Sequence, residues 1–191
     1  MQQMSKLIFR YLSRGTSMDE DAQAVCLYGI DIFLYTLIST MGLLLIGALA
    51  HRFFEAVIWI TLYYLNQTFG GGYHATSHLK CFITMVIFLA TCLLLLTVAI
   101  PLYLQILLLI VSSMLLFLFP LRLHENKRYL AKHSRFFVIR YRCVLLLEFC
   151  IAILLLLALP GQYAEMCMLG VATSAISRIV GILQDKMHHI T

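Results

Sequence analysis

The chain has 191 residues, of which 62% are hydrophobic and only 12% are charged, and its formal net charge is +5 at pH 7. With a mean hydropathy of +0.92 it has too little polar surface to cover a soluble globule, which excludes the water-soluble classes of protein. We therefore predict a polytopic membrane protein that contacts lipids and binds no nucleic acid.

Residues 1–15 have the pattern of an amphipathic helix that lies in the membrane interface. Apolar side chains recur at helical spacing on one face, and basic side chains follow at every fourth residue on another. The apolar set is Met4, Leu7, Ile8, Tyr11 and Leu12, and the basic set is Lys6, Arg10 and Arg14. Because the basic residues interrupt the stretch, we expect no cleavable signal peptide. Residues 17–20 match a capping box for the next helix.

Long apolar runs follow, each close to the length of about 20 residues that crosses a bilayer as a helix. Polar, glycine and proline residues separate them at the places where turns are expected. The six predicted spans are residues 25–50, 53–69, 81–100, 102–119, 143–159 and 164–183. We therefore predict an all-α, polytopic membrane helical bundle with about six transmembrane helices, which forms a single domain over residues 1–191.

The distribution of basic residues predicts how the bundle is oriented. If both termini and the second and fourth connections are cytoplasmic, Arg52 alone of the 14 lysines and arginines lies outside. The fourth connection, residues 120–142, is then a basic cytoplasmic segment. Arg178 falls within the last span, and we expect its side chain to snorkel to the interface. In this orientation His74 and Cys81 face the cytoplasm.

The segment from Gly70 to Cys81 is polar and glycine-rich, and it lies between two apolar runs. It contains His74 and Cys81, a pairing of a general base with a thiol nucleophile. A straight helix would separate these two residues by about 10 Å along its axis, so the segment has to bend, and the glycines at 70–72 permit a bend. Cys81 would lie in the first turn of the next helix. There Lys80 and the backbone N–H groups would favour the thiolate. The same N–H groups could also form an oxyanion hole.

Zinc chemistry is an alternative for the same segment. His74, His78 and Cys81 have a spacing that could gather three zinc ligands on a helix. A HExxH metallopeptidase has a glutamate directly after its first histidine, whereas this chain has Ala75. We therefore expect no metal and no other cofactor, and we interpret His78 as an interfacial residue, with an intramembrane metallopeptidase as the alternative.

Polar residues inside the spans suggest a second alternative, a peptide transporter. Asp31 and Glu148 are costly in hydrocarbon and could line a pathway, but no nucleotide-binding motif or inverted repeat accompanies them. We interpret both as structural, with Arg140, Arg142 or a proton satisfying Glu148. All six cysteines are expected to be free thiols. A face of small residues predicts close packing of the last helix: Gly170, Ser174, Ser177 and Gly181.

The order Gly-Gly-Tyr-His-Ala at residues 71–75, six residues between His74 and Cys81, and a cysteine at the start of a hydrophobic helix resemble the accessory gene regulator B (AgrB) family. The resemblance extends over essentially the whole chain, including the amphipathic N-terminus, the six spans and the basic fourth connection. Family members often carry an arginine a few residues before the histidine, whereas this chain has Asn66-Gln67-Thr68-Phe69. The third catalytic element is therefore open: Asn66 or Gln67 could orient His74, or both could be interfacial.

The resemblance implies a membrane-embedded cysteine endopeptidase with His74 as general base and Cys81 as nucleophile. Such an enzyme would cleave an AgrD-type propeptide on its C-terminal side, hold it as a thioester on Cys81, and promote its cyclisation to a thiolactone or lactone autoinducing peptide. The resemblance also implies a homodimer in the cell membrane of a Gram-positive bacterium. The basic connection 120–142 would contact either the acidic tail of the propeptide or anionic lipids.

Overall fold

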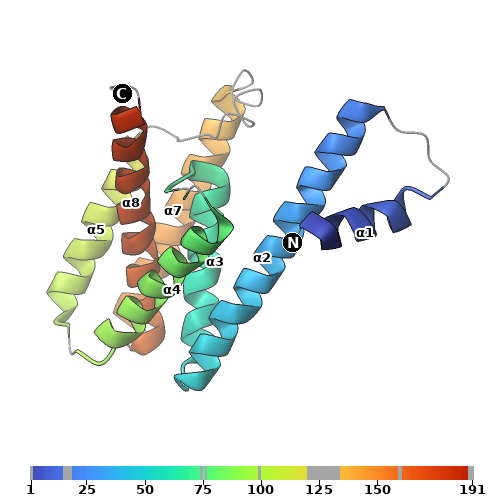
Figure 1. Ribbon diagram of the computed structural model, residues 1–191. Helices are drawn as coiled ribbons and strands as arrows, with labels where there is room; N and C mark the ends of the chain where they lie inside the picture. Colours follow the sequence, from blue (N-terminus) through green and yellow to red (C-terminus); the bar gives the residue numbers. More distant parts are fainter. Residues whose placement is uncertain are drawn as a thin grey trace.

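The computed structural model describes residues 2–14, 19–73, 75, 77–98, 100–119, 134–158 and 161–188. Every regular element in these residues is an α-helix (Figure 1). Four helical stretches are long and apolar enough to cross a membrane: Glu20–Leu49, His78–Leu95, Val138–Ala158 and Gln162–Gln184. The protein is therefore a helical membrane bundle, which confirms the predicted fold class.

Helix α1 (Gln2–Leu12) confirms the helix that the amphipathic pattern predicted. It lies across α2 (Glu20–Leu49), and its Ser5 is buried against that helix (Figure 1). Met4, Leu7 and Tyr11 of the predicted apolar face are exposed. Such a face suits burial in the headgroup region, so the interfacial location stays a prediction.

Helix α2 is capped by Asp19, whose side chain accepts a hydrogen bond from the backbone N–H of Ala22 at 2.8 Å. The cap is thus Asp19, whereas the predicted box would have used Ser17, which lies outside the described residues. Glu20 and Asp21 place negative charge at the positive end of the helix dipole, so the helix begins before the first apolar residue.

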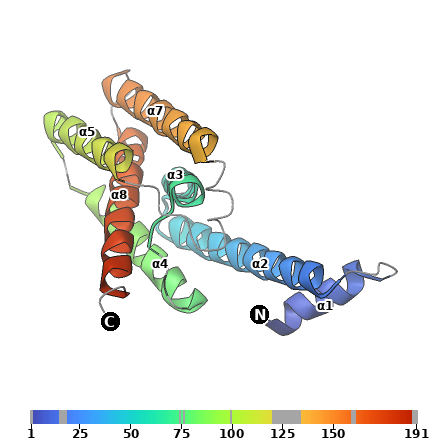
Figure 2. The ribbon, with the colours of Figure 1, turned by 90° about the horizontal axis from the view of Figure 1, so that it is seen from above.

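Helix α3 (Phe53–Gly70) forms the centre of the bundle. It contacts α2, α4 (His78–Leu95), α7 (Ser134–Ala158) and α8 (Gln162–His188), which surround it in Figure 2. Its Trp59 is fully buried, stacks on Tyr63 with ring centroids 4.8 Å apart, and donates a hydrogen bond to Thr173 of α8 at 3.1 Å. Because α3 is wrapped by other helices, it can carry polar residues that a lipid-facing helix could not.

Two predicted spans differ from the four apolar ones. Helix α3 carries Glu55, Asn66 and Gln67 and is less apolar, while α5 (Leu102–Leu118) is strongly apolar but shorter. Helix α5 packs on α7 and α8. Both helices occupy the positions that the sequence predicted, and a total of six membrane crossings stays a prediction.

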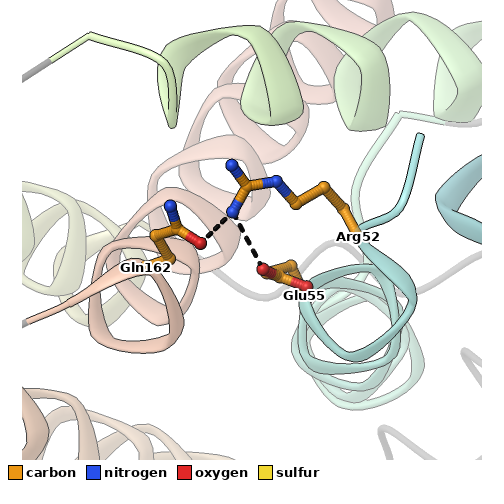
Figure 3. A network of polar contacts seen from close by, with 3 residues as sticks. All are labelled: Arg52, Glu55 and Gln162. Carbon is orange, nitrogen blue, oxygen red and sulfur yellow. Dashed lines mark hydrogen bonds and ion pairs between the residues drawn. The ribbon is translucent and has the colours of Figure 1, made fainter.

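Polar contacts join the ends of the bundle at which α3, α5 and α8 begin. Arg52 Nη1 donates to the carboxylate of Glu55 at 3.2 Å and also to the side-chain oxygen of Gln162 (Figure 3). Gln105 Nε2 donates to the carboxylate of Glu165 at 2.8 Å. These contacts tie the starts of three helices together on the side predicted to lie outside the cytoplasm.

Candidate active site

Cys81 is the fourth residue of α4, which confirms that it lies in the first turn of a helix. Ser77 caps this helix: its side chain accepts from the backbone N–H of Lys80 at 3.3 Å, and its carbonyl accepts from the N–H of Cys81 at 3.1 Å. The side chain of Cys81 is half-buried and has no disulfide. The cap therefore occupies two of the N–H groups that were predicted to form an oxyanion hole.

His74 and Thr76 lie outside the described residues, so the pairing of His74 with Cys81 stays a prediction. The zinc alternative also needs His74 and is likewise untested. Among the residues that the structure does describe, no group of three histidine, cysteine or acidic side chains gathers as a metal site. Residues 70–73 of the segment are described, and they show the backbone path directly after α3.

The backbone bends at Gly71, as the glycine-rich pattern predicted. Gly71 has φ 69° and ψ 172°, a conformation that other residues rarely adopt, and its N–H donates to the carbonyl of Gln67 at 3.1 Å. At Gly70 a Cβ atom would collide with the guanidinium of Arg178. The first two glycines therefore serve two purposes, a turn at Gly71 and a close approach of another helix at Gly70.

Arg178 is the side chain that approaches the bend, and the expectation that it snorkels is wrong. It is 1% exposed, and it donates to the carbonyls of Gly71 and Leu116, each at 3.3 Å. It also donates to the Tyr141 hydroxyl at 2.6 Å and lies over the ring of Tyr141 at 4.7 Å. Carbonyls at the C-terminal ends of α3 and α5 carry partial negative charge, so the cation is stabilised without reaching water.

Ser177, the neighbour of Arg178, is a hydrogen-bonding residue as well as a small one. Its hydroxyl accepts from the backbone N–H of Tyr73 at 3.2 Å and from Gln67 Nε2 at 2.7 Å, and it lies 3.3 Å from the Tyr63 hydroxyl. Together, Ser177 and Arg178 hold the segment that leads into His74. Sequence reasoning missed this role, although two adjacent polar residues in an apolar helix were a signal of it.

Asn66 is buried, which corrects the interfacial interpretation of this residue. Its Nδ2 donates to the carboxylate of Glu148 at 2.8 Å, and its Oδ1 accepts from the Tyr141 hydroxyl at 3.2 Å. Asn66 is thus the observed partner of Glu148, while Arg142 lies over the ring of Phe117. The network runs from Arg178 through Tyr141 and Asn66 to Glu148 and supports the structural interpretation of that carboxylate.

Gln67 occupies a different position from Asn66. Its Nε2 is held by Ser177, and its Oε1 is buried without a hydrogen-bond partner in the described part of the chain. A buried amide oxygen of this kind normally has a partner. Of the two candidates for the third catalytic element, Asn66 thus has its side-chain oxygen engaged by Tyr141, while that of Gln67 has no partner among the described residues.

Asp31 of α2 and His78 of α4 lie close together. Asp31 Oδ1 accepts from the Ser5 hydroxyl at 2.9 Å, and Asp31 Oδ2 lies 3.4 Å from His78 Nε2. The ring of His78 also contacts that of Tyr35, with centroids 4.6 Å apart. These contacts join α1, α2 and α4, which gives Asp31 a structural role and ties His78 to its neighbours rather than to the interface alone.

A cavity of about 290 Å³ lies between α2 and α4. It is lined by Tyr35, Ile38, Ser39, His78, Leu79 and Phe82. His78, Leu79 and Phe82 come from the first turns of α4, on both sides of Cys81 in the sequence. The Tyr35 hydroxyl is buried and makes no hydrogen bond of ordinary geometry to a described residue.

Comparison with known proteins gives a family-level match. The sequence model of the accessory gene regulator B (AgrB) family matches residues 5–179. A protein from Clostridium perfringens (strain 13 / Type A), AgrB-like protein 1, is 28% identical over 97 residues, which are 51% of this chain. The aligned region spans 52% of that relative, or about half its length. No solved structure matches the chain.

Proposed function

Because the chain belongs to the accessory gene regulator B family, we propose that it is a membrane-embedded cysteine endopeptidase that cleaves and cyclises a signalling propeptide. The family assignment supports a part in accessory gene regulator quorum-sensing peptide processing. The finer proposal concerns the chemistry. The observation that carries it is the position of Cys81, in the capped first turn of α4 and directly after Lys80.

In the proposed first step, His74 takes the proton from the Cys81 thiol, and the thiolate attacks the carbonyl carbon of the scissile peptide bond. A carbon–sulfur bond forms, and the carbonyl electrons move to oxygen. When the carbon–nitrogen bond breaks, His74 gives its proton to the leaving amine. The N-terminal part of the propeptide then remains on Cys81 as a thioester.

In the second step, a cysteine thiol or serine hydroxyl of the same peptide attacks the thioester carbonyl. The nucleophile loses its proton to His74, the bond to Cys81 breaks, and the Cys81 sulfur recovers the proton. The product is a cyclic thiolactone or lactone. A thioester retains an activated carbonyl, so transfer within the peptide can compete with hydrolysis where the bundle keeps water away.

The surroundings of the segment supply positioning residues for this chemistry. Arg178 and Ser177 fix the backbone at Gly71 and Tyr73, one residue before the proposed base. The Oε1 of Gln67, which has no partner among the residues that the structure describes, would accept from the imidazole of His74. Accurate placement matters because a displacement of about 1 Å at a reacting group can cost about 100-fold in rate.

The substrate and its surroundings follow from the same proposal. We take the substrate to be a propeptide of the AgrD type that reaches the cytoplasmic face of the bundle, with membrane lipids around the helices. The basic connection 120–142, most of which lies outside the described residues, would attract an acidic peptide tail. The protein would act as a homodimer, with both termini in the cytoplasm.

Intact mass spectrometry tests the proposal directly. The full chain in liposomes is incubated with a synthetic AgrD-type propeptide, and native protein is compared with Cys81→Ala and His74→Ala. We expect a mass increase that maps to Cys81 in the native protein, and neither adduct nor cleavage in the two variants. Cys26→Ala, which removes another half-buried thiol, serves as the matched control and should behave as native. Cleavage that survives Cys81→Ala would overturn the cysteine mechanism.

A further inference from the structure

Acyl transfer at Cys81 needs donors for the oxygen of the tetrahedral intermediate, and two of the N–H groups expected to supply them at the start of α4 are already engaged. The backbone N–H groups of Lys80 and Cys81 already donate to Ser77. An N–H group that donates within the helix cap cannot at the same time donate to the oxyanion of an acyl group bound to the Cys81 sulfur. Ser77 leaves the N–H groups of His78 and Leu79 unoccupied, and a donor from another element would act beside them.

Tyr35 of α2 is placed to be that donor. It lines the cavity together with His78, Leu79 and Phe82, which lie on both sides of Cys81 in α4, and its hydroxyl is buried without a hydrogen bond of ordinary geometry to any described residue. Buried hydroxyls are normally paired, so an unpaired one at a cavity points to a ligand atom. The contact of its ring with His78 holds Tyr35 in this orientation.

The cavity next to Tyr35 is open to one side and has a largely apolar lining. Ile38, Leu79 and Phe82 give it apolar walls, and the ring of Phe82 is seated against Gly42, where a Cβ atom would come within 2.9 Å of the ring. Its volume of about 290 Å³ is just below the range of about 300–1,000 Å³ for small-molecule sites. That size suits one large side chain rather than a longer piece of peptide.

We propose that this cavity is the subsite for the propeptide residue whose carbonyl becomes the thioester on Cys81. A large apolar side chain of that residue enters between Ile38 and Phe82, and the Tyr35 hydroxyl donates to its carbonyl oxygen. The inference rests on the proposed acyl transfer and adds to it both a substrate preference and a catalytic residue.

Peptide aldehydes test the subsite without knowledge of the natural substrate. The thiol adds across the aldehyde carbonyl: a sulfur–carbon bond forms, and the thiol proton passes to the former carbonyl oxygen. Two probes that differ only in the last residue, acetyl-Gly-Gly-leucinal and acetyl-Gly-Gly-alaninal, are compared on the full chain in nanodiscs. Binding is measured as protection of Cys81 from iodoacetamide, read by mass spectrometry.

We expect native protein to bind the leucinal probe about tenfold or more tightly than the alaninal probe, as an apolar pocket discriminates by this order. Ile38→Trp should fill the pocket and abolish this preference. Leu37→Trp is the matched control, because Leu37 is 46% and Ile38 is 47% exposed and only Ile38 lines the cavity. The subsite is overturned if native protein shows no preference, or if Ile38→Trp retains it.

Tyr35→Phe separates the catalytic role from packing because it keeps the ring and removes only the hydroxyl. We expect acylation of Cys81 by the propeptide to slow by about 100-fold with KM little changed, and protection by the aldehyde to weaken. Alkylation by iodoacetamide alone, which forms no oxyanion, should keep its native rate. Tyr28→Phe, at an exposed position of α2, is the control. Unchanged acylation in Tyr35→Phe would remove Tyr35 from the mechanism.

These outcomes are distinguishable from failure of the proposed function. If native protein shows no adduct with the propeptide at Cys81, acyl transfer itself is wrong, and the subsite falls with it. If the adduct forms but the preference and the Tyr35 effect are absent, acyl transfer stands and the subsite alone is overturned.

Discussion

At the scale of single residues, sequence predicted a nucleophile but not the side chains that hold the segment before it. Cys81 could be proposed because a thiol after a polar glycine-rich segment is unusual in an apolar chain. Arg178 could not be assigned, because its partners Gly71, Leu116 and Tyr141 come from three distant parts of the chain. Only the packed bundle shows that hydrogen-bond acceptors inside the protein, and not water, pair with this guanidinium.

Substitution Arg178→Lys should weaken both the fold and the activity. A lysine keeps the charge but cannot reproduce the planar set of donors that reaches two carbonyls and one hydroxyl. We expect a loss of about 1–3 kcal/mol in the free energy of unfolding and a reduced rate of Cys81 acylation. Thermal unfolding in detergent and initial rates measure the two effects. Arg10→Lys, at an exposed site on α1, should change neither by much.

The substitution Ser177→Ala tests the hydroxyl that holds the segment before His74. It removes the acceptor for the Tyr73 N–H and for Gln67 Nε2, so we expect the acylation rate to fall by about tenfold or more through misplacement of the base. Ser174→Ala is the matched control, because its equally buried hydroxyl donates only to the carbonyl of Gly170 within α8. Equal rates in the two variants would contradict a positioning role for Ser177.

At the scale of helices, the apolar runs predicted which segments are helical better than where they end. Helix α2 begins at Glu20 and α7 begins at Ser134, whereas the predicted spans begin at 25 and 143. Hydropathy marks only the part of a helix that suits hydrocarbon, and capped or basic extensions continue the same helix beyond it. Helix α3 shows that polar residues can also lie within a predicted span, because the neighbouring helices bury them.

The start of α4 offers a test at this scale. Ser77→Ala removes the cap and should cost about 1 kcal/mol of local helix stability. Fraying of the first turn would then lower the rate at which iodoacetamide alkylates Cys81, because the thiolate loses part of the helix-end field. Ser77→Asn restores a capping oxygen and should recover most of the rate. Alkylation at the native rate in Ser77→Ala would show that the cap does not influence the thiol.

At the scale of the whole molecule, the predicted orientation places Cys81 and the basic connection on one side and the contacts of Arg52 on the other. Single-cysteine variants test it in intact cells with a membrane-impermeant maleimide. A cysteine at His51, exposed between α2 and α3, should be labelled from outside. A cysteine at Gln3, exposed on α1, should be labelled only after the membrane is opened. Labelling of both positions from outside would contradict the orientation.

The contacts of Arg178 also bear on the order in which the protein becomes active during synthesis. The ribosome delivers α3 and its glycine turn to the membrane about a hundred residues before Ser177 and Arg178 of α8 emerge. Until the last helix inserts, the carbonyl of Gly71 and the N–H of Tyr73 lack the partners that fix them. A nascent or truncated chain therefore lacks the contacts that hold Gly71 and Tyr73, and we expect acylation of Cys81 only when insertion of α8 is complete.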